Sequence, residues 1–272
     1  MAERLVFTHM GKAGGSTING ALYLVMANCG ASTLAFSGAS STYGNSTLPL
    51  KLLRRYGLEA SDFPIVTGHL PFATAWRCFA PATFVTVLRE PADMLLSSYC
   101  SQPWNRDKAD FGLGRFTWRV KYRWRIDPRF RTQTEWCIDN YQTRMLCDDP
   151  RFGRPSTREM LEQAKQNLDS IYAVVGFQDR LSAFLEALGN LYGVDLTCCA
   201  EQMVNATGSY RRFVTDRHLD VARRHSPLDV ELYDWARDRF RVCRAERRLG
   251  APIPNAAFRK YAVGPDRFEL AC

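Results

Sequence analysis

The stretch "FTHMGKAGGST", residues 7–17, decides the fold, because it joins an apolar run to a helical pattern through a glycine-containing turn. Residues 4–9, "RLVFTH", are rich in β-formers and predict a short buried strand. Residues 16–30, "STINGALYLVMANCG", have the apolar spacing of a helix that ends at Gly30. A strand, a glycine loop and a helix in this order predict a phosphate-binding loop, whose backbone N–H groups face an anion at the helix N-terminus.

The loop carries one positive charge and two hydroxyls. Lys12 precedes Gly14 and Gly15, whereas a Walker A loop places its lysine after the glycines. Ser16 and Thr17 add hydrogen-bond donors. These residue types favour phosphate as the ligand, but a short glycine loop is also found as a simple turn, and the loop alone leaves both readings open.

Further apolar runs alternate with helical patterns along the chain. Residues 63–69, 82–90 and 171–177 predict strands, and helical stretches at 91–100 and 179–193 follow the last two. This alternation predicts a P-loop-like, three-layer α/β fold, with a central, mostly parallel sheet flanked by helices. Ligands of such folds bind at the carboxyl ends of the strands.

The final third of the chain is expected to be mainly helical. Residues 226–250 predict a helix with Ser226 as N-cap, Pro227 at the first position and Gly250 as its stop. Residues 37–48 predict a loop. No repeat, low-complexity tract or linker divides the 272 residues, so residues 1–272 are expected to form a single domain.

Composition limits the partners without choosing one. Lys plus Arg number 36 against 28 Asp plus Glu, a net charge of +8 that suits a nucleotide, an acidic glycan, nucleic acid or a membrane surface. A solvated basic surface is the alternative. The nine cysteines include no CxxC pair and no zinc spacing with histidine, so we expect reduced thiols and no metal site.

The N-terminus has no basic region followed by a long apolar run, so no signal peptide is expected. No stretch is apolar enough to predict stable membrane insertion. If Met1 is the native start, these features predict a cytoplasmic protein, although a chain trimmed of an anchor would have the same sequence. The sequons at Asn45 and Asn205 are then expected to be unused.

The predicted strand 82–90 ends in polar side chains. Arg89 closes one strand, and Ser97 lies eight residues later, about two turns into the next helix. Arginine suits bidentate phosphate contacts, but Arg89 could equally pair with Glu90 or Asp93.

Two histidines also follow predicted strands, His9 after the first and His69 after the second. A histidine with a pKa near 6.5 can take a proton from a hydroxyl nucleophile, although a structural histidine is the commoner case.

Together these motifs resemble those of sulfotransferases that use 3′-phosphoadenosine 5′-phosphosulfate (PAPS). Residues 7–17 resemble the 5′-phosphosulfate loop, and residues 85–99, "VTVLREPADMLLSSY", resemble the 3′-phosphate motif with its Arg-to-Ser spacing. Further segments resemble the carbohydrate branch akin to heparan sulfate 2-O-sulfotransferase. They are "GHLPF" (68–72), "DNYQTRMLC" (139–147), "VVGFQDRL" (174–181), "VNAT" (204–207) and "PLDVELYDWARDRF" (227–240).

The resemblance implies a role for particular residues. Lys12 would stabilise the leaving phosphate, and His69 would be the general base. The donor PAPS, and the product 3′,5′-adenosine diphosphate (PAP), would be held by Lys12, Ala13, Gly14, Gly15, Ser16, Thr17, Arg89, Ser97, Thr207, Gly208 and Arg211. The acceptor would contact His9, Arg144, Arg119 and Arg123, with nucleotide contact also open for Arg144. Met10, Ala13 and Glu90 depart mildly from the usual motifs, and the hydroxyl usual at position 13 is lost.

Residues 103–131 interleave nine Lys/Arg and three Asp with aromatic side chains. Since aromatic faces stack on sugars and arginines pair with anionic groups, this segment is a hypothetical acceptor-binding element. A basic amphipathic helix that covers the core is the alternative, and single-stranded nucleic acid binding is a third possibility that no recognised motif supports.

The sequence as a whole predicts an enzyme, a PAPS-dependent O-sulfotransferase for a carbohydrate or glycoconjugate, which would include anionic acceptors. It would need no metal and would not bind nucleic acid. The alternatives are a P-loop kinase-like phosphotransferase acting on a small metabolite and a non-catalytic basic module for glycan or nucleic acid. The acceptor, the sulfated position and the oligomeric state are not predicted.

Overall fold

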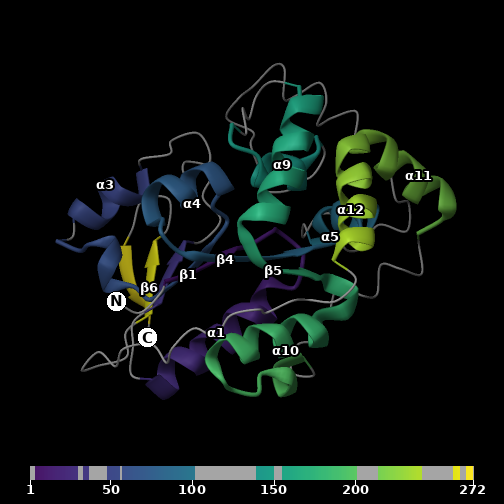
Figure 1. Ribbon diagram of the computed structural model, residues 1–272. Helices are drawn as coiled ribbons and strands as arrows, with labels where there is room; N and C mark the ends of the chain where they lie inside the picture. Colours follow the sequence, from purple (N-terminus) through teal and green to yellow (C-terminus); the bar gives the residue numbers. More distant parts are fainter. Residues whose placement is uncertain are drawn as a thin grey trace.

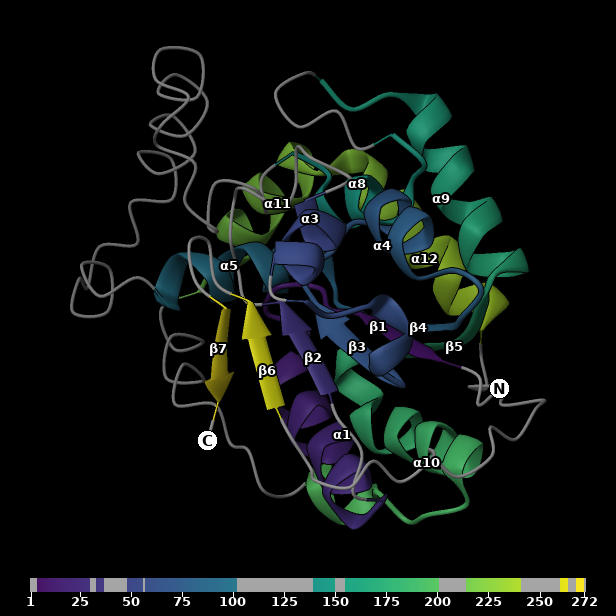
Figure 2. The same ribbon diagram turned by 90° about the vertical axis from the view of Figure 1, so that its left-hand side faces the viewer.

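The computed structural model describes residues 4–29, 33–36, 48–55, 57–101, 139–149, 155–200, 214–240, 260–263 and 268–271. Its strands form one seven-stranded sheet in the order β5-β4-β1-β3-β2-β6-β7 (Figure 2). All neighbours pair in parallel except β6 and β7, which are antiparallel. The strands are β1 (Leu5–Thr8), β2 (Thr33–Phe36), β3 (Ile65–Gly68), β4 (Thr83–Leu88), β5 (Tyr172–Phe177), β6 (Lys260–Val263) and β7 (Phe268–Ala271).

Helices pack on both faces of the sheet. Helices α1 and α10 cover one face, and α4, α8, α9 and α12 lie over the other (Figures 1 and 2). This arrangement confirms the predicted three-layer α/β fold with a mostly parallel sheet. The helices are α1 (Gly15–Cys29), α3 (Leu48–Arg55), α4 (Phe72–Phe79), α5 (Pro91–Ser101), α8 (Tyr141–Leu146), α9 (Arg158–Ser170), α10 (Leu181–Tyr192), α11 (Asp216–His225) and α12 (Pro227–Arg239).

The central strands are apolar on both faces because both faces are covered. Every residue of β1, β3 and β4 is buried, as expected for parallel strands between two helical layers. The hydroxyls of these strands are paired inside the core. Thr8 shares a 2.9 Å hydrogen bond with the Tyr172 hydroxyl, and Thr86 donates to the carbonyl oxygen of Thr8 at 2.9 Å.

The register of the central strands brings their carboxyl ends to one edge of the sheet. Thr8 is opposite Gly68 in β3 and opposite Thr86 in β4. The ladder continues one residue further, since the N–H of His9 donates to the carbonyl oxygen of Gly68 at 2.9 Å. Whatever follows β1, β3 and β4 in the chain therefore meets at this edge.

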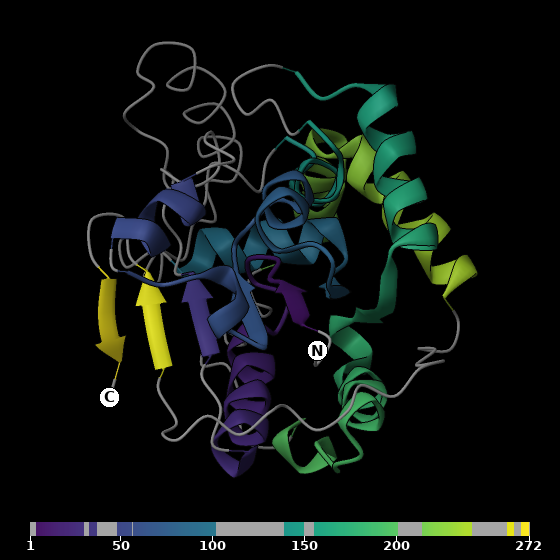
Figure 3. The same cartoon turned by 60° about the vertical axis from the view of Figure 1, so that its left-hand side comes forward.

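The four predicted strands and the helices after β1, β4 and β5 are confirmed within one or two residues. Strands β2, β6 and β7 were not predicted. Of these, β6 and β7 form one edge of the sheet (Figure 3) within the third of the chain expected to be mainly helical. The predicted loop 37–48 was wrong at its last residue, which begins α3, and 37–47 lie outside the described residues.

The predicted helix over 226–250 was wrong in length. Ser226 and Pro227 occupy the N-cap and first position as predicted, but α12 ends at Arg239. Phe240 leaves the helical conformation at φ −108° and ψ 55°, and its ring packs edge-on against Trp235 with 5.8 Å between the ring centroids. Helix α12 therefore ends before Gly250, which lies outside the described residues.

Cys78, Cys147, Cys198 and Cys199 are free thiols in the described part of the chain, as predicted for the cysteines in general. No helix among the described residues has both the length and the apolar character needed to cross a bilayer.

Candidate functional site

The loop between β1 and α1 is held in an unusual backbone conformation. Lys12 has φ 65° and Gly14 has φ 85°. Glycine adopts this left-handed region freely, whereas for lysine it costs on the order of 1 kcal/mol. The N–H of Ala13 donates to the carbonyl oxygen of Met10, and that of Thr17 to Gly14, at 3.3 and 3.1 Å. The loop is therefore a set of tight turns that lead directly into the first turn of α1.

Helix α1 presents its N-terminus at the carboxyl edge of the sheet. Its first N–H groups have no carbonyl group four residues earlier within the helix, and its dipole is positive at this end. Ser16 is exposed there and Lys12 is half-buried, while Ala13 and Thr17 are buried. Lys12 and Ser16 are thus the predicted loop side chains that an anion can reach.

Arg89 reaches from the end of β4 to this loop. Its Nη1 donates to the carbonyl oxygen of Lys12 at 2.6 Å, and the residue is only 8% exposed. The Gln142 side chain brackets the Arg89 backbone, since its Oε1 accepts from the Arg89 N–H at 3.0 Å and its Nε2 donates to the Arg89 carbonyl at 2.8 Å. The structure therefore joins Lys12 and Arg89, which the sequence placed in two separate motifs.

Ser97 lies in α5 and is 1% exposed. A hydroxyl so deeply buried is out of reach of a ligand in this conformation, and its predicted phosphate contact gains no support from its position.

The carboxylate of Glu90 accepts from the Asp93 N–H at 2.7 Å and from Arg223 of α11 at 3.1 Å.

His69 lies directly after β3 and is oriented by its neighbour. Its Nδ1 is 2.9 Å from the carbonyl oxygen of His9. Since a carbonyl only accepts, Nδ1 must carry the proton, which leaves a lone pair on Nε2 when the ring is neutral. Burial lowers the pKa of His69 to about 4, despite the opposing effect of this hydrogen bond. At neutral pH the ring is therefore an unprotonated base with a defined tautomer.

His9 stacks on His69 with 4.1 Å between ring centroids and 27° between ring planes. Burial holds the pKa of His9 well below its usual value, and the nearby His69 lowers it further. The two predicted histidines thus form one contiguous neutral pair beside the loop.

Helix α8 supplies site residues that the sequence reasoning missed. The Tyr141 hydroxyl accepts from the Gly11 N–H at 3.4 Å, and Tyr141 is 1% exposed. A Cβ atom on Gly11 would lie 3.6 Å from this hydroxyl and 3.9 Å from Cε1 of His69. Tyr141 and Gln142 therefore support the loop and Arg89, and both lie in the segment 139–147 that carried the family resemblance.

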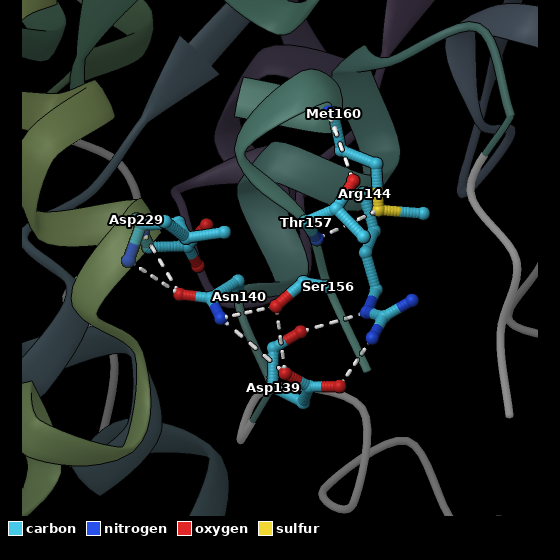
Figure 4. A network of polar contacts seen from close by, with 8 residues as sticks. Asp139, Asn140, Arg144, Ser156, Thr157, Met160 and Asp229 are labelled. Atoms are coloured by element: carbon cyan, nitrogen blue, oxygen red, sulfur yellow. Dashed lines mark hydrogen bonds and ion pairs between the residues drawn. The ribbon is translucent and has the colours of Figure 1, made fainter. Parts of the chain in front are cut away.

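Helices α8 and α12 cap each other's N-termini, and Figure 4 shows the half of this contact in which Asn140 faces the start of α12. Asn140 Oδ1 accepts from the N–H groups of Leu228 and Asp229 at 2.7 and 3.1 Å. In return, Asp229 accepts from the N–H groups of Gln142 and Thr143 at 3.0 and 2.8 Å, and from the Thr143 hydroxyl at 2.8 Å. This reciprocal cap fixes α8, and with it Gln142, against α12.

Arg144 is tied into the same region. Its Nε donates to the Asp139 carbonyl oxygen at 2.8 Å and its Nη2 pairs with the Asp139 carboxylate, while the residue is 2% exposed (Figure 4). The carboxylate also accepts from Ser156 at 2.9 Å. The contacts of Arg144 hold the start of α8, and its burial gives no support to the predicted acceptor or nucleotide contact.

Several predicted positions lie outside the described residues. They are Thr207, Gly208, Arg211, Arg119, Arg123, the segment 103–131 and the two sequons. Within the part of the chain that is described, no group of three or more His, Cys, Asp or Glu residues could hold a metal ion.

The described geometry therefore brings together the N-terminus of α1, a lysine, an arginine and a neutral histidine. No protein-family model matches the chain, and a search of the curated proteins finds no significant match.

Proposed function

We propose that this chain is a sulfotransferase that moves the sulfuryl group of PAPS to a hydroxyl of a carbohydrate or glycoconjugate. The observation that carries the proposal is the convergence of four predicted site residues, Lys12, Arg89, His9 and His69, at one edge of the sheet. Arg89 binds the carbonyl of Lys12, and His69 binds the carbonyl of His9 at the start of the same loop. A phosphate-binding loop beside a base suits group transfer to a hydroxyl.

The reachable donors fit the phosphosulfate end of PAPS. The N-terminus of the 15-residue helix α1, the half-buried Lys12 and the exposed Ser16 together suit a phosphate oxygen. When bound, PAPS would supply the sulfuryl group, and its 5′-phosphate would be the stable leaving group. Contact of Arg89 and Ser97 with its 3′-phosphate rests on the sequence resemblance, because both side chains are buried.

The residues of the site would divide the reaction between them. His69 accepts the proton of the acceptor hydroxyl at Nε2 as the new S–O bond forms. Lys12 and the N-terminus of α1 stabilise the negative charge left on the phosphate oxygen as the old S–O bond breaks. The proton ends on His69 and the electron pair of the broken bond on PAP.

The low pKa of His69 has a consequence for this role. A general base works best when its pKa is near the reaction pH, and an anion beside the ring favours its protonated form. Binding of PAP or PAPS is therefore expected to raise the pKa of His69 above its value of about 4 in the nucleotide-free protein.

Thermal unfolding with PAP and with ATP tests the proposal, followed by transfer of labelled sulfate from PAPS to panels of glycans, lipids and phenols. PAP should stabilise the protein, and a carbohydrate should accept label. His69→Gln should abolish transfer and keep PAP binding, whereas His218→Gln on α11 should keep both. Stabilisation by ATP with none by PAP would support the kinase-like alternative, and no response to either nucleotide would support a non-catalytic module. Either result would overturn the proposal.

A further inference from the structure

The imidazole of His9 lies within a stack of three rings. Its centroid is 5.5 Å from that of Phe7, with 13° between the planes, and 4.1 Å from that of His69. Phe7 and His9 are two residues apart on β1 and its extension, so they project to the same side of the sheet. The ring of His9 therefore shields one face of the His69 ring from water.

The same ring also touches the start of α1. A Cβ atom on Gly15 would lie 1.6 Å from Nε2 of His9, 2.1 Å from Cδ2 and 2.3 Å from Cε1. No side chain fits at position 15 unless His9 moves, so glycine is needed there for close approach rather than for backbone freedom. The edge of His9 thus fills the space between the base and the first residue of the anion-binding helix.

We propose that His9 is a positioning residue for His69, holding it by a ring stack and a carbonyl hydrogen bond at a fixed place relative to the N-terminus of α1. The catalytic meaning of this role rests on the proposed function, but the contacts do not. The carbonyl oxygen of His9 selects the tautomer of His69. The ring of His9 fixes the orientation of the His69 ring and shields one of its faces from water. Neither task needs His9 to touch a reacting atom.

Electrostatics favour an uncharged pair. Protonation of either ring places a positive charge beside the other ring, in a site where burial already disfavours charge. Among the described residues, the ionisable side chain of Tyr141 on α8 also lies near the pair, since a Cβ atom on Gly11 would lie 3.6 Å from its hydroxyl and 3.9 Å from Cε1 of His69. Burial within the stack therefore keeps His69 neutral at neutral pH.

Histidine titration by NMR tests the role of the ring without reference to activity. The chain has only four histidines, so the ring signals can be assigned by substitution. In His9→Ala, the midpoint of His69 should rise from about 4 toward the ordinary value, by about one unit or more, because water reaches the ring. In His9→Phe, which keeps an aromatic ring on the base, it should stay within about half a unit of the parent. Nitrogen shifts should show the Nδ1–H tautomer in the parent and in His9→Phe.

A matched pair of glycine substitutions tests the same contact with His9 intact. Gly15→Ala forces the His9 ring to move and should raise the His69 midpoint, whereas Gly20→Ala in the same helix meets nothing within 4 Å and should leave it unchanged. Circular dichroism verifies that each variant is folded. An unchanged midpoint in both His9→Ala and Gly15→Ala, or an equal rise in His9→Phe, would overturn the proposal. If the midpoint shifts as expected but the protein binds neither PAP nor PAPS, the positioning role of His9 is supported and only the proposed function is refuted.

Discussion

Replacing Asp229 by alanine tests the junction that supports the site. Asp229 is fully buried, and its carboxylate accepts three hydrogen bonds from the first turn of α8. Two donors are the backbone N–H groups of Gln142 and Thr143, and the third is the Thr143 hydroxyl. Asp229→Ala removes the acceptor for all three, while Asn140 still caps α12.

The loss of stability follows from the number of stranded donors. A buried donor left without an acceptor costs about 1–3 kcal/mol, and water that enters the new space recovers part of this. We therefore expect the free energy of unfolding to fall by about 3–5 kcal/mol. Asp234→Ala is the control, because Asp234 is exposed on the same helix. This substitution should change the free energy of unfolding by no more than about 0.5 kcal/mol.

The effect should also depend on pH. Burial raises the pKa of Asp229 from 3.8 to about 6, although its hydrogen bonds oppose the rise. A carboxyl whose pKa is raised by folding stabilises the protein most below about pH 4, and this contribution is lost as the pH rises to about 6. The destabilisation by Asp229→Ala should therefore shrink from pH 4 to pH 6 and then level off.

Urea unfolding followed by circular dichroism, at several pH values between 4 and 8, measures both effects. Asp229→Ala should unfold at a clearly lower urea concentration than Asp234→Ala at every pH. If the two variants unfold together, the carboxylate does not bridge α8 and α12. If the gap widens with pH, the sign of the pKa shift is wrong.

Three further changes test other contacts. Lys12→Gly should change the free energy of unfolding by no more than about 1 kcal/mol, since glycine accepts φ 65°. It should weaken PAP binding about tenfold or more in calorimetry, because the positive charge is lost. An unchanged affinity for PAP would show that Lys12 does not contact the nucleotide. Gln142→Leu strands the N–H and carbonyl of Arg89 and should lower the free energy of unfolding by about 2–4 kcal/mol in urea; a neutral result would contradict the bracketing contact. Burial raises the pKa of the Cys147 thiol to about 12, so iodoacetamide at pH 8 should modify the exposed Cys198 and spare Cys147 in the folded protein, and peptide mass spectrometry would show the reverse order if this is wrong.

The parts of the fold that could be predicted from the sequence are those in which one local pattern suffices. Residues 5–8, 65–68, 83–88 and 172–177 are apolar runs long enough to be recognised, because parallel strands are covered on both faces. Strand β2, "TLAF", has four residues like β1 and β3, but it has no distinctive flanking signal. Its existence depends on pairing with β3 and β6, which no local pattern shows.

Some features of the candidate site could also be predicted from local patterns, whereas others depend on tertiary contacts. That His9 and His69 follow strands was visible in the sequence, and so was their expected place at the carboxyl edge. That they touch depends on the pairing of Thr8 with Gly68, since a register shift would separate them. The close contact between His9 and the start of α1 could not be predicted either, because nothing in the sequence shows that the His9 ring occupies the side-chain space of Gly15.

The conformation of Lys12 shows why the loop sequence is an incomplete description of the site. A lysine at φ 65° is unfavourable by itself, so something outside the loop must hold it, and Arg89 does so at the carbonyl oxygen. The backbone of Arg89 is in turn bracketed by Gln142, on a six-residue helix whose first turn is capped by Asp229. Each of these bonds joins segments more than 50 residues apart in the chain. The conformation of the loop is therefore stabilised by tertiary contacts and not by the loop sequence alone. A peptide of residues 4–29 would lack these contacts, and we expect Lys12 to leave the left-handed conformation in it.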